Sequence, residues 1–172
     1  MKLIKSVTLD TGVNSQKISD VFSADYKLYK IMLSGIVGNE STATAVNTRL
    51  VKASDDSTED DTIYEYALFS LKSEASFSDS QDLDDTRWFN TFGGIDDGAQ
   101  AGGGVLYLSN PFGTDYTFGV FESVNHTNGP NFRSYWGTVC IRDTVSYDGI
   151  TIDLNESAAR IGGGVVSIYG II

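Results

Sequence analysis

Apolar and polar side chains alternate along short stretches of this 172-residue chain, and clusters of glycine, asparagine or aspartate separate the stretches. The alternation is clearest near the end, where Ile150, Ile152 and Leu154 are separated by single polar residues. A period of two residues is typical of a β-strand with one buried face. No stretch keeps the helical period of about 3.6 residues over three turns. The pattern therefore predicts an all-β protein.

The end of the chain, Gly162-Gly-Gly-Val-Val-Ser-Ile-Tyr-Gly-Ile-Ile172, predicts a strand with a glycine-rich entry. A similar phrase occurs earlier, as Gly102-Gly-Gly-Val-Leu-Tyr-Leu108. A strand at a chain end is ordered only when it is paired in a sheet. We therefore expect both segments to be strands of one β-rich body.

The same criteria predict about nine or ten strands, spaced as in an antiparallel two-sheet sandwich. The clearest strands lie at residues 2–9, in the second half of 18–36, and at 44–52, 64–71, 102–109, 116–124, 134–141, 149–154 and 162–172. We expect a single β-sandwich domain, jelly-roll-like, over residues 1–172. Long irregular loops are expected at about 53–62 and 73–101, and a loop as long as the second is usually functional or interfacial.

Aromatic and aliphatic residues in or beside these strands form the candidate core. The residues that we expect in the core or in strands are Phe22, Tyr26, Tyr29, Tyr107, Ile168 and Tyr169. Tyr135 and Trp136 lie in a predicted strand, which favours core positions for both. Trp88 lies in the irregular region and is the better candidate for an interface anchor.

The chain is strongly acidic, with a net charge of −11 and a sequence pI near 4.3. Such a charge repels the phosphates of nucleic acids and the headgroups of anionic membranes. We therefore expect neither nucleic acid nor a membrane as a partner. The first residues hold no apolar run of signal-peptide length, and no stretch approaches the roughly 20 apolar residues of a membrane span. Synthesis in the cytoplasm is expected.

Residues that commonly carry catalysis or bind metals are scarce. His126 is the one histidine and Cys140 the one cysteine, so a Ser–His–Asp arrangement would have to use His126, and a zinc site lacks ligands. Acidic runs at 55–61, 79–85 and 96–97 leave calcium open, although none has the spacing of an EF-hand. Solvated charged loops are the simpler interpretation. We predict that the protein is not an enzyme and uses no cofactor or metal.

Several motifs follow one another along nearly the whole chain. They comprise Val21, Phe22, Tyr26, Tyr29 and Ile31, then Thr48-Arg-Leu-Val51, then Tyr64 and Tyr66, then Leu106-Tyr-Leu-Ser-Asn-Pro-Phe112, and finally Val166-Ser-Ile-Tyr-Gly170. This ordered set resembles a group of small β-sandwich proteins in the virions of tailed phages, common in marine and cyanobacterial phages.

The resemblance implies a non-enzymatic structural protein on the exterior of a phage virion, made in the cytoplasm of the host bacterium. A head decoration or knob and a tail-associated protein both agree with it, and the small size favours the head. Its partners would be other virion proteins, of the capsid or the tail. A homo-oligomer such as a trimer also agrees, but the residues do not separate a trimer from a monomer. The alternative is a receptor- or glycan-binding module of a tail fibre, which the aromatic and aspartate-rich loops favour.

The segment from Arg87 to Phe92 is the candidate docking surface. It contains Arg87, Trp88, Phe89 and Phe92 inside the long irregular region, with aspartates on either side. Arginine and tryptophan are enriched among the residues that dominate interface energies. We therefore expect the substitution Trp88→Ala to weaken assembly while leaving folding largely intact.

Overall fold

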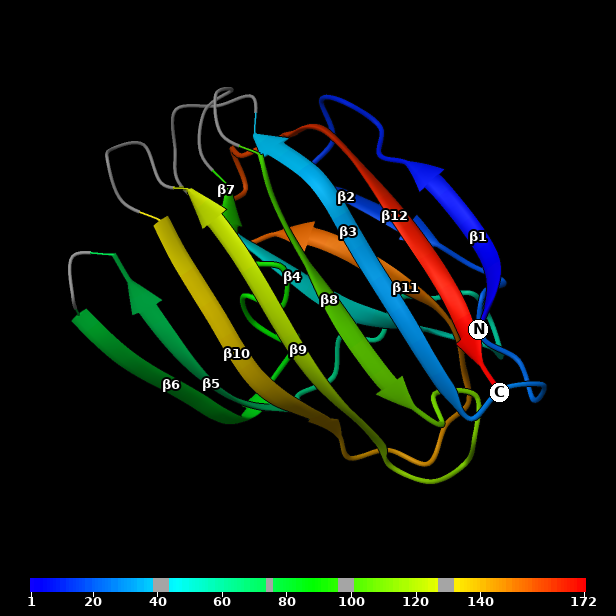
Figure 1. Ribbon diagram of the computed structural model, residues 1–172. Coiled ribbons are helices and arrows are strands. Elements are labelled where there is room, and N and C mark those ends of the chain that lie inside the picture. Colours follow the sequence, from blue (N-terminus) through cyan, green and yellow to red (C-terminus); the bar gives the residue numbers. More distant parts are fainter. Residues whose placement is uncertain (39–43, 74–75, 96–100, 127–131) are drawn as a thin grey trace.

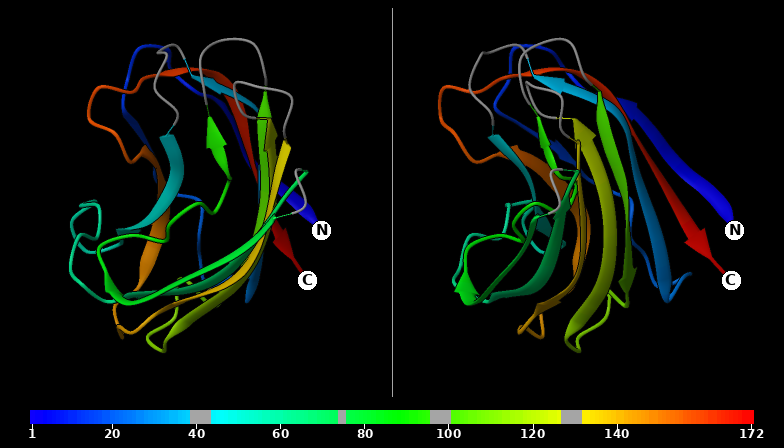
Figure 2. Two further views of the ribbon diagram at one scale, coloured as in Figure 1. Left: turned by 90° about the vertical axis from the view of Figure 1, so that its left-hand side faces the viewer. Right: turned by 60° about the vertical axis from the view of Figure 1, so that its left-hand side comes forward.

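The computed structural model describes residues 1–38, 44–73, 76–95, 101–126 and 132–172. Within these residues every regular element is a β-strand, and twelve strands form an eight-stranded and a four-stranded antiparallel sheet. The two sheets lie face to face, and the larger one curves around the smaller one (Figure 1 and Figure 2). The predicted all-β sandwich is confirmed, with more strands than expected.

The strands follow the chain as β1 (Lys2–Thr8), β2 (Ser15–Ile18), β3 (Leu28–Gly38), β4 (Thr44–Lys52), β5 (Tyr64–Lys72), β6 (Ser76–Asp85), β7 (Gly94–Ile95), β8 (Gly102–Ser109), β9 (Thr117–His126), β10 (Phe132–Ile141), β11 (Tyr147–Leu154) and β12 (Ile161–Ile171). In the large sheet the order of neighbours is β1-β12-β3-β8-β9-β10-β5-β6, and in the small sheet it is β2-β11-β4-β7.

The hydrophobic core fills the space between the two sheets. From the small sheet, β11 contributes Ile150, Ile152 and Leu154, the residues whose alternation is clearest in the sequence. From the large sheet, Ile31 of β3 and Leu106 of β8 belong to the same buried cluster. Alternate residues of each strand point towards this core, so the period of two in the sequence translates directly into one buried and one outward face.

The terminal strand is held on both sides. β12 pairs with β1 along one edge and with β3 along the other. Val166 and Ile168 are fully buried, whereas Ile172 beyond the strand is 99% exposed. The expectation of a docked terminal strand is therefore confirmed, and β8, which begins with the similar glycine-rich phrase, lies two strands away in the same sheet.

The chain between residues 73 and 101 is more regular than expected. β6 and β7 both form there, and β6 pairs with β5 along its length. The sequence of β6 gives little sign of this, because serine, aspartate and glutamine occupy both of its faces and remove the contrast of a half-buried strand. Tertiary pairing therefore overrides a weak local preference. Residues 53–62 contain no regular strand, as expected.

The two edges of the large sheet carry charged residues. β1 carries Lys2 and Lys5, and β6 carries several aspartates, Asp79, Asp82 and Asp85 among them. Charged side chains on an edge strand oppose uncontrolled pairing with the sheet of another molecule. The edges of this sheet are therefore poor sites for assembly, which directs attention to its faces.

Candidate functional site

The predicted docking segment places its two bulkiest side chains in the core. Trp88 and Phe92 are both 0% exposed. The indole N–H of Trp88 donates a hydrogen bond of 2.8 Å to the backbone oxygen of Cys140, and its ring packs edge-on against Tyr64. Trp88 and Thr48 of β4 exchange backbone hydrogen bonds, and this pairing turns the indole inwards. Neither Trp88 nor Phe92 forms an exposed surface, which corrects the expectation.

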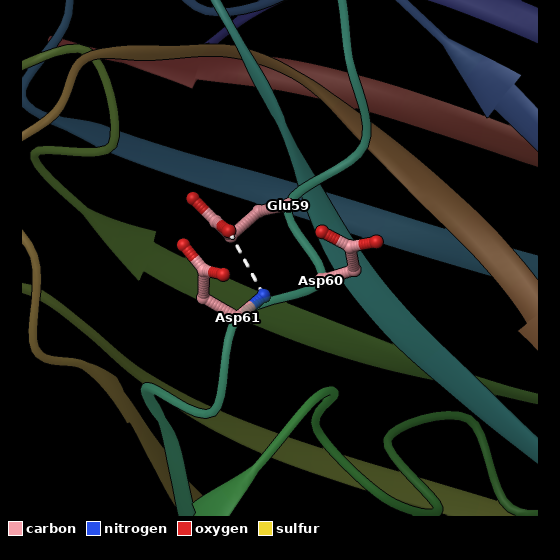
Figure 3. Close-up of side chains that lie close together, drawn as sticks. All are labelled: Glu59, Asp60 and Asp61. Atoms are coloured by element: carbon pink, nitrogen blue, oxygen red, sulfur yellow. Dashed lines mark hydrogen bonds between the residues drawn. The ribbon is translucent and has the colours of Figure 1, made fainter.

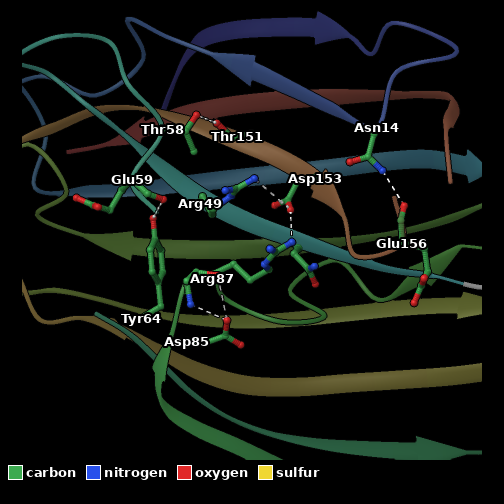
Figure 4. Close-up of polar contacts among 12 residues, drawn as sticks. Asn14, Arg49, Thr58, Glu59, Tyr64, Asp85, Arg87, Thr151, Asp153 and Glu156 are labelled. Atoms are coloured by element: carbon green, nitrogen blue, oxygen red, sulfur yellow. Dashed lines mark hydrogen bonds and ion pairs between the residues drawn. The ribbon is translucent and has the colours of Figure 1, made fainter. Parts of the chain in front are cut away.

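Arg87 and Phe89 lie nearer the surface, but each has an intramolecular partner. Arg87 Nη1 lies 2.7 Å from Asp153 Oδ2, and Arg49 Nη2 lies 3.5 Å from the same oxygen (Figure 4). Burial raises the pKa of the Asp153 carboxyl, and the two guanidinium groups act in the opposite direction. The ring of Phe89 lies 6.1 Å from that of Tyr66. These contacts anchor the segment, and an interface role for Arg87 and Phe89 stays a prediction.

The residues expected in the core or in strands divide between two environments. The fully buried ones are Phe22, Tyr29 and Ile168. Tyr26 is half-buried, and its ring lies 5.9 Å from that of Tyr29. Tyr107 and Tyr169 lie in β8 and β12 but are only half-buried, because their positions alternate with the buried Leu106 and Ile168. Both therefore belong to the outward side of the large sheet.

One acidic run brings three carboxyl groups together, those of Glu59, Asp60 and Asp61, with one oxygen of each within 4.8 Å of the others. Glu59 is fully buried and already pairs with Lys52 Nζ at 3.1 Å, while the hydroxyl of Tyr147 donates a hydrogen bond to it. The side chain of Asp60 stands apart from the other two (Figure 3). Because Lys52 balances the buried charge, we interpret Glu59 as an anchor of the loop. The acidic pair at 96–97 lies outside the described residues.

A second candidate surface is the outer face, by which we mean the side of the eight-stranded sheet that points away from the core. Its exposed aromatic residues include Phe69, Phe77, Phe118, Phe132 and Trp136, which are between 43% and 80% exposed. Val120 and Val124 of β9 are also about half exposed. A few isolated apolar side chains are normal on a surface, but a contiguous group on one face indicates a binding site.

One row of residues on the outer face carries no charge. One row of directly paired residues crosses all eight strands, from Phe77 through Leu71, Ser134, Val124, Gly103, Ser34 and Val165 to Thr8. None of these side chains is charged. On a chain with a net charge of −11, this row is a neutral path across the outer face, and the neighbouring row carries Asp79 and Glu122. Depletion of charge is a compositional mark of binding surfaces.

Two parts of the outer face differ in chemistry. Towards the β6 edge, Phe69, Leu71 and Phe77 form what we call the apolar strip, which lines an open hollow of about 400 Å³ together with Trp136. Phe69 faces Asp79 directly across the β5–β6 pair. The strip is therefore an apolar patch with an acidic border.

Towards the middle of the sheet lies a shallow groove of about 690 Å³, which we call the glycine groove. The backbone of Gly102, Gly103 and Gly104 forms its floor, and Tyr107 and Trp136 are among the residues that line it. A side chain at Gly103 is excluded, since its Cβ would lie 2.5 Å from the backbone oxygen of Leu33. The close approach of β3 and β8 therefore keeps the floor free of side chains.

Strand parity in the sequence already indicates that Trp136 lies on the outer face. Neighbouring residues in a strand point to opposite faces, so Tyr135 and Trp136 cannot both face the core. Val139 and Ile141, which share the parity of Tyr135, are buried, and this parity would have assigned Trp136 to the outside. Tyr135 is 6% exposed and Trp136 is 43% exposed, which corrects the expected core position of Trp136.

Among the described residues no helix is long and apolar enough to cross a membrane. Comparison of the chain with protein-family models, with curated proteins and with solved structures gave no match.

Proposed function

We propose that this chain is a non-enzymatic structural protein of a tailed-phage virion, an accessory component on the particle exterior that attaches through the apolar strip. The observation that carries the proposal is the exposure of Phe69 and Phe77, which are 66% and 80% exposed and lie diagonally across the β5–β6 pair. Aromatic side chains left in water on the outer face supply the apolar centre that docking surfaces use.

The occupant of the strip is another virion protein, of the capsid or the tail. The strip itself is neutral, and Asp79 faces it across the β5–β6 pair. A complementary partner therefore presents an apolar patch bordered by lysine or arginine. A second copy of this chain is less suitable at this position, because it would bring a second acidic border against the first. This argument concerns the strip alone and leaves a homo-oligomer elsewhere on the surface as a separate proposal.

Attachment in many copies suits a surface of this size. Each strip contributes only a few large side chains, and single contacts of this kind are weak. On a symmetric particle, an oligomer of the chain would add such contacts together and raise the overall affinity without any new contact. We propose the particle surface as its location and the head as its site, in line with the resemblance described above.

The test is a reconstitution on purified particles. We expect mass spectrometry to detect the chain in purified virions. The double variant Phe69→Ala with Phe77→Ala should melt at the temperature of the wild-type protein, because both side chains are exposed. It should bind to stripped particles at least about tenfold more weakly, which equals about 1.4 kcal/mol.

The matched control is Leu3→Ala, which removes an apolar side chain that is 51% exposed on β1, at the opposite edge of the same sheet. This variant should bind particles as the wild-type protein does. Absence of the chain from purified particles would overturn the virion proposal. Wild-type binding by the double variant would exclude the strip as the docking surface.

A further inference from the structure

We infer that the glycine groove is a binding site for a neutral saccharide. The groove lies on the outer face over β3, β8, β9 and β10, next to the apolar strip and separated from it by Trp136. Its volume of about 690 Å³ falls within the range of small-ligand sites, roughly 300–1,000 Å³. The inference does not depend on attachment to a virion.

Two aromatic rings define the groove. Trp136 lies on β10 and Tyr107 on β8, so the two rings come from strands separated by β9. Strands in a sheet are about 4.8 Å apart, which places the two backbones about 10 Å from each other. Between them β9 contributes Glu122, and the glycine backbone of β8 leaves an open floor beside the Glu122–Val105 pair. A pyranose ring has an apolar face of C–H groups, and it can pack that face on either aromatic ring while its edges stay in water.

Polar and charged side chains also line the groove. Glu122 of β9 is the direct cross-strand neighbour of Trp136 on one side and of Val105 on the other. Lys30 of β3 holds its Nζ 5.7 Å from the centre of the Tyr107 ring. Ser134 of β10 also lines the groove. A carboxylate that accepts hydrogen bonds and an ammonium group that donates them match the mixed character of sugar hydroxyls.

The charges of the groove favour a neutral ligand. Glu122 and Lys30 are the charged residues among those that line it, and their charges are opposite. A phosphate or a nucleotide would meet one lysine, one glutamate and a chain with a net charge of −11, so its binding would lack a cluster of positive charge. A neutral saccharide uses both groups as hydrogen-bond partners and needs no net charge. The balanced charges of the groove therefore favour a neutral saccharide over an anionic ligand.

The groove also differs from a gap that is left over from core packing. Trp136 is 43% exposed and Glu122 is exposed, and the register of the sheet places them side by side on the outer face. In a folded monomer, exposure of an indole beside a carboxylate brings no stability from burial. A ligand that covers the indole of Trp136 and donates hydrogen bonds to the Glu122 carboxylate would give both exposed side chains a role.

The experiment is a binding measurement with purified protein and a panel of neutral di- to tetrasaccharides of the gluco, galacto and manno series. Intrinsic fluorescence follows binding, because Trp136 lies in the groove whereas Trp88 is buried. We expect at least one member to bind. Trp136→Ala should weaken that binding at least about tenfold, and Tyr107→Ala and Glu122→Gln should weaken it as well. Calorimetry replaces fluorescence for the variant without Trp136.

Phe77→Ala is the matched control, since it removes an exposed aromatic residue of the apolar strip that does not line the groove. It should bind the saccharide as the wild-type protein does. Lack of binding to every neutral member of the panel would overturn the inference, as would unchanged binding by folded Trp136→Ala and Glu122→Gln variants. Preference for acidic sugars over neutral ones would contradict the proposed ligand class. None of these outcomes depends on particle attachment, which the double variant Phe69→Ala with Phe77→Ala tests separately.

Discussion

Trp88 and Trp136 show how one residue type serves two purposes in the same sandwich. Trp88 is fully buried, its ring packs against Tyr64 at 5.3 Å, and its N–H is bonded to Cys140. Trp136 lies on the outer face and is 43% exposed. Removing Trp88 therefore leaves a large cavity and two orphaned contacts, whereas removing Trp136 leaves a smaller aromatic surface in water.

We accordingly predict that Trp88→Ala lowers the free energy of unfolding by about 3–5 kcal/mol, the usual cost of deleting a buried aromatic side chain. This replaces the expectation from the sequence that the variant folds normally. Trp136→Ala should change the same free energy by less than about 1 kcal/mol, as surface substitutions generally do. Urea denaturation of both variants measures the two values. Equal stability of Trp88→Ala and wild type would contradict the buried position.

For single residues, the sequence identifies core positions reliably only in strands where the two-residue alternation of apolar and polar side chains is clear. The residues at 150, 152 and 154 are buried as their alternation indicates. Tyr107 and Tyr169 lie in strands as expected, but the alternation along each strand places their side chains on the outward side. The inward turn of Trp88 depends on backbone pairing with Thr48, forty residues away in the chain. No local pattern encodes such a contact, so composition suggested an interface where the fold has a core.

The strand β12 leads to a prediction about a whole element. It pairs with both β1 and β3, so deletion of residues 167–172 removes Ile168 and Tyr169 and strips two neighbours of backbone hydrogen bonds. Burial of one large apolar side chain is worth about 1.5–3 kcal/mol, and total stability is only about 5–15 kcal/mol. We expect the truncated chain to lack a cooperative thermal transition.

Deletion of Ile172 alone is the control, because this residue lies beyond β12 and is 99% exposed. Its melting temperature should equal that of the wild-type protein. Cooperative melting of the longer truncation near the wild-type temperature would show that β12 is dispensable. The terminal strand was predictable from its Val, Ile and Tyr content. β6 was not, since its aspartates and serines disfavour a strand and only β5 holds it in the sheet.

For the whole molecule, the arrangement of layers explains why one face of the large sheet is free to carry the proposed binding surfaces. One side of the eight-stranded sheet is covered by the smaller sheet and its connecting loops (Figure 2), and the other side faces outwards. The all-β sandwich fold class was accessible from the periodicity. The outer face was not, because it is assembled from alternate residues of many strands, and the order of those strands does not follow their order in the chain.

The two surfaces on this face should respond differently to salt, which provides the last prediction. The apolar strip has an acidic border at β6, so its association with a basic partner is accelerated by electrostatic attraction, which added salt screens. The groove contains one carboxylate and one ammonium group, and its proposed ligand is neutral, with no net charge to screen. Raising the salt concentration should therefore slow association with particles, change the dissociation rate little, and leave the saccharide dissociation constant unchanged.

Biolayer interferometry on immobilised particles and calorimetry with the saccharide measure these quantities. A strong salt dependence of saccharide binding would mean that the groove recognises charge. An association rate with particles that does not change with salt would show that the acidic border takes no part in docking.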